Sequence, residues 1–80
     1  GGGAIVLEGT GRVSREPRQV PLLATRLGDK LMVSTVRSES QWLRNIEADP
    51  NVVVHLYGKR RAATAEVARG TLNIVAISLA

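Results

Sequence analysis

The chain has 80 residues, of which 44% are hydrophobic. This content is too high for a disordered protein, and the length allows one small domain with a thin core. The chain contains no Cys, which excludes disulfides, thiolate metal sites and a Cys nucleophile. Eleven Lys and Arg stand against seven Asp and Glu, and the net charge of +4 favours an anionic partner.

No apolar run approaches the ~20 residues of a membrane span, and no basic-then-apolar leader precedes a cleavage site. We therefore expect a cytoplasmic protein without a membrane partner. The glycines at 1–3 are interpreted as a cloning remnant or flexible lead, which leaves residues 4–80 as a single domain.

Short apolar or alternating runs, separated by Gly- and Pro-containing breaks, predict strands along most of the chain. In chain order these strands cover residues 4–8, 18–27, 30–35, 51–57, 60–68 and 71–80. Gly28-Asp29 is interpreted as a tight hairpin turn. Pro21 has no amide to donate, so its strand is expected to be irregular or to expose an edge there.

One segment follows a helical period instead. Ser38-Glu39-Ser40-Gln41 fits a capping box with Ser38 as the N-cap, and Asp49-Pro50 is a stop signal. The sequence therefore predicts one short amphipathic helix near residues 39–48. Six strands and one helix joined by short turns favour a mainly β protein, a six-stranded, mostly antiparallel barrel.

The sets of side chains that form common enzyme active sites are largely absent from this sequence. His55 is the only histidine, so neither a Ser-His-acid set nor a histidine metal cluster can be built, and we expect it to be structural and expect no metal site. If the protein is an enzyme, a bound cofactor of the reduced-flavin type suits it, because the protein then needs only to orient ring and acceptor. Such cofactors carry phosphate, which the three arginines of the turn at residues 12–18 could hold.

Three stretches resemble the deazaflavin-dependent nitroreductase family, and the resemblance runs from about residue 5 to residue 67. TGRVSREPRQVPLL is similar to the family signature T-G-R-x-S-G-x-P-R-x-x-P-L. SQWLRNIEADPNVVV is similar to its W-x-x-N-x-x-A-x-P-x-V segment, and YGKRRAATAEV resembles the hairpin that follows. The resemblance implies a split β-barrel related to the flavin-binding pyridoxamine 5'-phosphate oxidase fold.

The resemblance also implies a deazaflavin site, for coenzyme F420. One group would line the phosphate and tail of the cofactor, a second would lie beside the ring, and a third would frame the pocket. These groups are Arg12, Ser14 and Arg18; Ser34 and Thr35; and Arg37, Ser38, Trp42 and Asn45. The N-terminus of the helix would add its positive dipole end.

Several of these residues have a purely structural alternative. Trp42 is equally suited to core packing, Asn45 to a backbone hydrogen bond, and Arg18 to an edge charge that discourages aggregation. Residues 59–61 are interpreted as a solvated hairpin tip.

The sequence also departs from the family pattern. Val13 stands where the family often has a basic residue, and Arg15 stands where Gly is usual. The customary N-terminal helix and a C-terminal region with substrate-facing aromatics have no counterpart here.

Three functions remain open at this stage. The first is an oxidoreductase that transfers a hydride from reduced deazaflavin to a small organic acceptor such as a nitro compound or quinone. The second is a non-catalytic protein that binds deazaflavin or FMN. The third is a small basic barrel that binds nucleic acid, which the scarcity of aromatic residues disfavours. A homodimer is also expected, because a thin core benefits from further burial.

Overall fold

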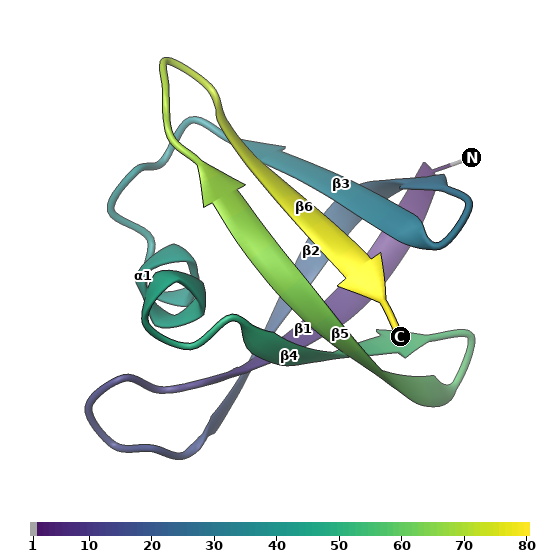
Figure 1. Ribbon diagram of the computed structural model, residues 1–80, viewed down its shortest axis with the longest axis horizontal. Helices are drawn as coiled ribbons and strands as arrows, with labels where there is room; N and C mark the ends of the chain where they lie inside the picture. The colour runs from purple at the N-terminus through teal and green to yellow at the C-terminus, as the bar shows by residue number, and fades with distance from the viewer. Residues whose placement is uncertain (1) are drawn as a thin grey trace.

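The computed structural model describes residues 2–80, and within them the chain forms six strands and one helix (Figure 1). In chain order these are β1 (Gly2–Thr10), β2 (Pro17–Leu27), β3 (Lys30–Thr35), α1 (Gln41–Ala48), β4 (Asn51–Leu56), β5 (Lys59–Ala68) and β6 (Asn73–Leu79). The six predicted strands and the helix are confirmed, with the helix beginning two residues later than expected. The interpretation of residues 59–61 as a hairpin tip is wrong, because all three belong to β5 and pair with residues of β4. Gly2 and Gly3, set aside in the sequence, pair with Thr25 and Ala24 as part of β1, while Gly1 lies outside the described residues.

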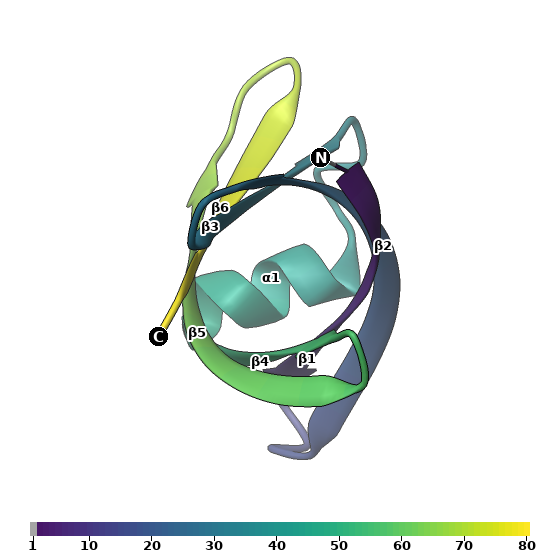
Figure 2. The same cartoon turned by 90° about the vertical axis from the view of Figure 1, so that its right-hand side faces the viewer.

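The strands close into a barrel in the order β1-β2-β3-β6-β5-β4, and every neighbouring pair is antiparallel. Figure 2 shows α1 lying across one opening of this barrel. The predicted six-stranded antiparallel barrel is therefore confirmed.

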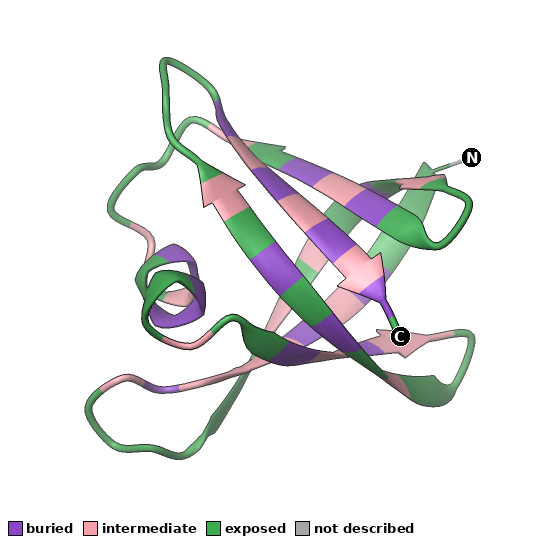
Figure 3. Cartoon of the chain, in the orientation of Figure 1, coloured by how far each residue is buried: buried purple, intermediate pink, exposed green. Residues whose placement is uncertain are grey.

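The core follows from strict alternation along the strands. In β6, residues at odd positions are buried and those between them are half-buried, and Figure 3 shows this alternation as coloured bands along β6. Leu43 and Ile46 of α1 close the core at the helix end, with exposed fractions of 0% and 2%. The barrel interior is therefore packed with side chains from every strand and from the helix.

The free edge expected at Pro21 is present. β2 pairs with β1 along nine residues, but only Thr25–Leu27 pair with β3, so residues 17–24 have a neighbour on one side only. The two-residue turn makes Leu27 and Lys30 a hydrogen-bonded pair, so odd-numbered amides of β2 face the β3 side. Pro21 therefore places its missing donor on the free edge, where it costs no ladder hydrogen bond.

The predicted capping box is wrong. The N-cap is Ser40, which makes no side-chain capping bond, and its Oγ donates instead to the carbonyl oxygen of Arg37. The Ser38 hydroxyl accepts a hydrogen bond from Asn73 Nδ2 at 3.1 Å. A tertiary contact has thus taken the side chain that the local pattern assigned to the cap.

Candidate functional site

The β1–β2 turn is a closed loop held by its own backbone. Gly11 N donates to Glu16 O at 2.8 Å, and Arg15 N donates to Gly11 O at 2.9 Å. A Cβ at Gly11 would lie 2.8 Å from Ser14 Oγ and 3.3 Å from Glu16 O, so any larger residue would displace the Ser14 side chain. Arg15 has φ 62°, which explains why the related family pattern has Gly at this position. The loop is therefore built to a fixed shape, with some strain at Arg15.

A buried amide joins this loop to the helix. Asn45 of α1 is 6% exposed, and its Oδ1 accepts from the backbone N of Arg12 at 3.1 Å and from Arg12 Nη1 at 2.9 Å. The first bond fixes the loop and the second fixes the guanidinium, whose other N–H groups are still available as donors. Asn45 thus fills the structural role considered for it and at the same time orients Arg12.

The loop, β2 and the start of α1 enclose a hollow of about 590 Å³. Its lining consists of Gly11, Arg12, Val13, Ser14, Arg18, Gln19, Val20, Gln41, Trp42 and Asn45. Five of the nine predicted site residues meet here, including both arginines that the sequence assigned to an anion. Arg18 Nη2 donates to Ser14 Oγ at 3.3 Å, so the second arginine also has a defined direction.

The first turn of α1 adds to the positive character of this hollow. Gln41 and Trp42 line it, the first turn contains no acidic residue, and within residues 2–80 no side chain caps the helix. Uncapped amides at a helix N-terminus attract an anion through their partial positive charge. Trp42 is half-buried against the core and also lines the hollow.

Of the other four predicted residues, Ser34 and Thr35 end β3, and Arg37 and Ser38 lie in the β3–α1 connection. Arg37 and Ser38 line a separate hollow of about 540 Å³ with Val36, Glu39 and Ser40. Ser34 and Thr35 line neither hollow: Ser34 is exposed, and Thr35 Oγ1 accepts from the backbone N of Arg37 at 3.1 Å. The structure therefore brings five predicted residues together and leaves four beside them.

Two residues that the sequence did not single out hold this connection. Asn73 is 0% exposed, and its Nδ2 donates to Thr35 O and Ser38 Oγ while its Oδ1 accepts from Gly70 N. Arg69 binds both carboxylate oxygens of Glu47, at 2.8 and 2.6 Å, and donates to Ser38 O at 2.6 Å. Hydrogen bonds from Arg69 lower the pKa of Glu47 below its usual value. Apart from the bond between Gly70 and Asn73, these contacts join residues more than 20 positions apart, so no local motif marks them.

The single histidine lies outside the hollow, in a polar cluster on β1, β2, β4 and β5. His55 Nε2 is 3.2 Å from Glu8 Oε1, and Arg60 Nη2 is 3.3 Å from Glu8 Oε2. A hydrogen bond from Gln19 first, and then the contacts with His55 and Arg60, lower the pKa of Glu8 below its usual value. His55 thus lies on the barrel wall, where its hydrogen bond with Glu8 joins β4 to β1. Among residues 2–80, no group of three or more His, Asp or Glu side chains is placed to hold a metal ion.

The comparisons with known proteins agree with this arrangement. Residues 1–73 match the family described as F420H(2)-dependent quinone reductase. The chain therefore belongs to this family: it is a deazaflavin-dependent oxidoreductase, with coenzyme F420 as the cofactor, and the resemblance found in the sequence is confirmed.

Solved structures share its fold at low identity. One described as an F420-H2 dependent reductase (FDR-A) is 17% identical, with a TM-score of 0.76 over 94% of this chain and 93% of that one. Another, described as an F420 reductase, is 13% identical, with a TM-score of 0.72 over 96% and 86%. A third, described as a domain-swapped dimer, is 17% identical, with a TM-score of 0.78 over 94% and 79%. No curated protein matches the chain.

Proposed function

We propose that the hollow between the β1–β2 loop and α1 holds the anionic tail of coenzyme F420, with Arg12 and Arg18 as its main charged ligands. The observation that carries this proposal is the pair of hydrogen bonds that Arg12 donates to the buried Asn45. These bonds orient the guanidinium toward the hollow before any ligand binds. Preorganised donors lose less conformational entropy on binding than mobile ones. A planar guanidinium also pairs bidentately with phosphate or carboxylate.

The remaining residues then divide by position. Ser14 and the first-turn amides of α1 would add neutral donors to the same anion, and Trp42 would cover it with an apolar surface. Ser34, Thr35, Arg37 and Ser38 would border the ring from the β3–α1 connection. When bound, the reduced deazaflavin supplies a hydride to an organic acceptor. The chain's own contribution is to bind, orient and shield the reactants from water, and a quinone is the proposed acceptor class.

The test compares two arginine variants by calorimetric titration with F420. Arg12→Ala keeps the backbone bond from residue 12 to Asn45, so the loop stays anchored and only the guanidinium is lost. Its affinity for F420 should fall by about 1.5–3 kcal/mol, the size of a charge-assisted hydrogen bond. Wild-type affinity should also fall as salt rises, because the attraction is partly screened.

Arg61→Ala is the matched control, because Arg61 lies on β5 outside both hollows and donates to Ala80 O. It should bind F420 like the wild type. Equal affinities in the two variants would refute the assignment of the hollow. Because half-buried Arg12 also bonds to Asn45, Arg12→Ala should lower the free energy of unfolding slightly, by about 1 kcal/mol.

A homodimer and a cytoplasmic location stay predictions. A face suited to self-association is the outer side of β3, β6 and β5, where Met32, Ile74 and Ala76 are only half-buried within one chain. Sedimentation at high protein concentration decides between dimer and monomer.

A further inference from the structure

The end of the barrel opposite α1 is formed by two hairpin tips. The β2–β3 tip consists of residues 27–30 and the β4–β5 tip of residues 56–59, and Figure 1 shows both at the end that also carries the two chain termini. Both tips border one cavity of about 500 Å³, whose lining includes Gly28 and Leu31 from one hairpin and Leu56 and Tyr57 from the other. We call these two tips together the hairpin end.

The hairpin end exposes large apolar side chains that the fold does not use. Leu27 is 65% exposed and Tyr57 is 85% exposed. Leu23 lies four residues before Leu27 on the same face of β2 and is 79% exposed. Tyr57 also has φ 52°, a left-handed conformation that favours Gly or Asn and is strained for an aromatic residue. Strain at a side chain that is 85% exposed points to a role outside the fold.

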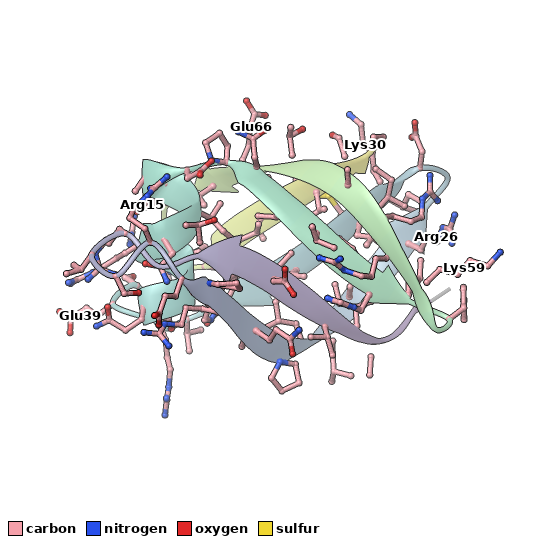
Figure 4. All side chains as sticks on the ribbon, turned by 90° about the horizontal axis from the view of Figure 1, so that it is seen from below. Arg15, Arg26, Lys30, Glu39, Lys59 and Glu66 are labelled. Carbon is pink, nitrogen blue, oxygen red and sulfur yellow. The ribbon has the colours of Figure 1, made fainter. Side chains whose placement is uncertain are left out.

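Cations surround these apolar side chains. Arg26, Lys30, Lys59, Arg60 and Arg61 lie in or next to the two tips, against one carboxylate in the tips, Asp29. Figure 4 shows Arg26, Lys30 and Lys59 at this end, while Arg15 and Glu39 lie at the helix end. Arg60 is near Glu8, but among residues 2–80 no carboxylate lies within ion-pair distance of Lys30 or Lys59. Their ammonium groups are therefore available to an external anion.

We propose that the hairpin end docks on an anionic lipid surface, with Tyr57 and Leu27 entering the interface and Lys30 and Lys59 contacting the headgroups. Tyr is suited to the membrane interface because its ring is apolar and its hydroxyl is polar. Peripheral attachment of this kind depends on apolar insertion together with attraction to acidic headgroups. The site departs from the sequence expectation of no membrane partner and does not depend on the cofactor assignment, because it uses the opposite end of the barrel.

A nucleic acid is the competing anionic partner, and the side chains at the hairpin end disfavour it. Single-stranded binders stack successive bases on aromatic rings, whereas this end offers one Tyr and two exposed leucines. An aliphatic side chain at a loop tip contributes more in a lipid interface, where it is transferred from water to an apolar medium.

The test is co-sedimentation of the full chain with vesicles of phosphatidylcholine, either alone or with roughly a third phosphatidylglycerol. The wild type should pellet with the mixed vesicles and stay largely in solution with the neutral ones or at high salt. Lys59→Gln should weaken binding about fivefold, the contribution of one cation near an acidic surface. Leu27→Ser combined with Tyr57→Asn should weaken it about tenfold or more.

Matched controls separate insertion from a change in folding. Asn is favoured at a left-handed turn position, so Tyr57→Asn should keep or raise the thermal midpoint. Leu72→Ser removes an apolar side chain of 48% exposure in the β5–β6 connection and should bind vesicles like the wild type. Equal pelleting of the wild type and the double tip variant would overturn the proposal. So would retention of a single-stranded oligonucleotide by the wild type without binding to acidic vesicles.

Discussion

Both ends of the barrel carry cationic side chains in or next to a turn that contains a strained residue, and the two turns differ in how the fold holds them. At the helix end, Arg15 is left-handed within a loop that is closed by two backbone bonds and tied to Asn45. At the hairpin end, Tyr57 is left-handed in a two-residue turn, and its side chain is 85% exposed. The difference lies in the buried partner, since Asn45 converts a basic turn into one wall of a hollow. Clustered charge alone therefore does not fix the direction of a cationic side chain.

The largest change in the free energy of unfolding is expected at Asn73, the buried amide side chain that holds the β3–α1 connection. Asn73→Ala removes three hydrogen bonds from a side chain that is 0% exposed, so the free energy of unfolding should fall by about 2–4 kcal/mol. Urea unfolding measures this change. Asn51→Ala is the control, because the Asn51 side chain is exposed and bonds only to nearby Asp49, and it should change stability by about 0.5 kcal/mol or less. Similar losses in both variants would show that Asn73 does not hold the β3–α1 connection.

A smaller, stabilising effect is expected from relieving the strain at each end. Arg15→Gly should raise the free energy of unfolding by about 0.5–1 kcal/mol, because the cost of a left-handed non-glycine residue exceeds the entropy cost of glycine. Tyr57→Gly should give a similar gain at the hairpin end. Arg15→Ala serves as the control, since it removes the same side chain and keeps the strain. If Arg15→Ala stabilises the protein as much as Arg15→Gly, the charge of the Arg15 side chain is unfavourable, and its left-handed backbone conformation is not.

The smallest effect concerns pH at the helix end. The pKa of Glu47 is lowered in the folded state from its ordinary 4.5, first by hydrogen bonds from Arg69. A carboxylate with a lowered folded pKa stabilises the protein above its unfolded pKa, and this contribution disappears as pH falls through the folded pKa. The loss of stability between neutral pH and values well below 4.5 should therefore be smaller in Glu47→Gln than in the wild type. Urea unfolding at several pH values measures it, and parallel pH profiles would contradict the assigned role of the pair.

Much of the fold could be predicted because its signals are local. Short apolar or alternating runs predicted all six strands, and Gly28, Tyr57 and Gly58 have the positive φ angles of tight hairpin turns. The start of the helix was missed for the opposite reason. Ser38 satisfies a local capping rule, but its hydroxyl is bonded by Asn73, 35 residues further along the chain.

The sequence by itself determined the family, the barrel and the segment that carries the clustered arginines of the β1–β2 loop, because each depends on the order and spacing of neighbouring residues. Only the tertiary structure decided which predicted residues share one hollow. Arg12 and Asn45 are 33 positions apart, and Arg37 and Ser38 line a different surface although one motif-based assignment grouped them all. Such contacts depend on how strands cross in a closed barrel, and no short pattern of residues encodes that distance.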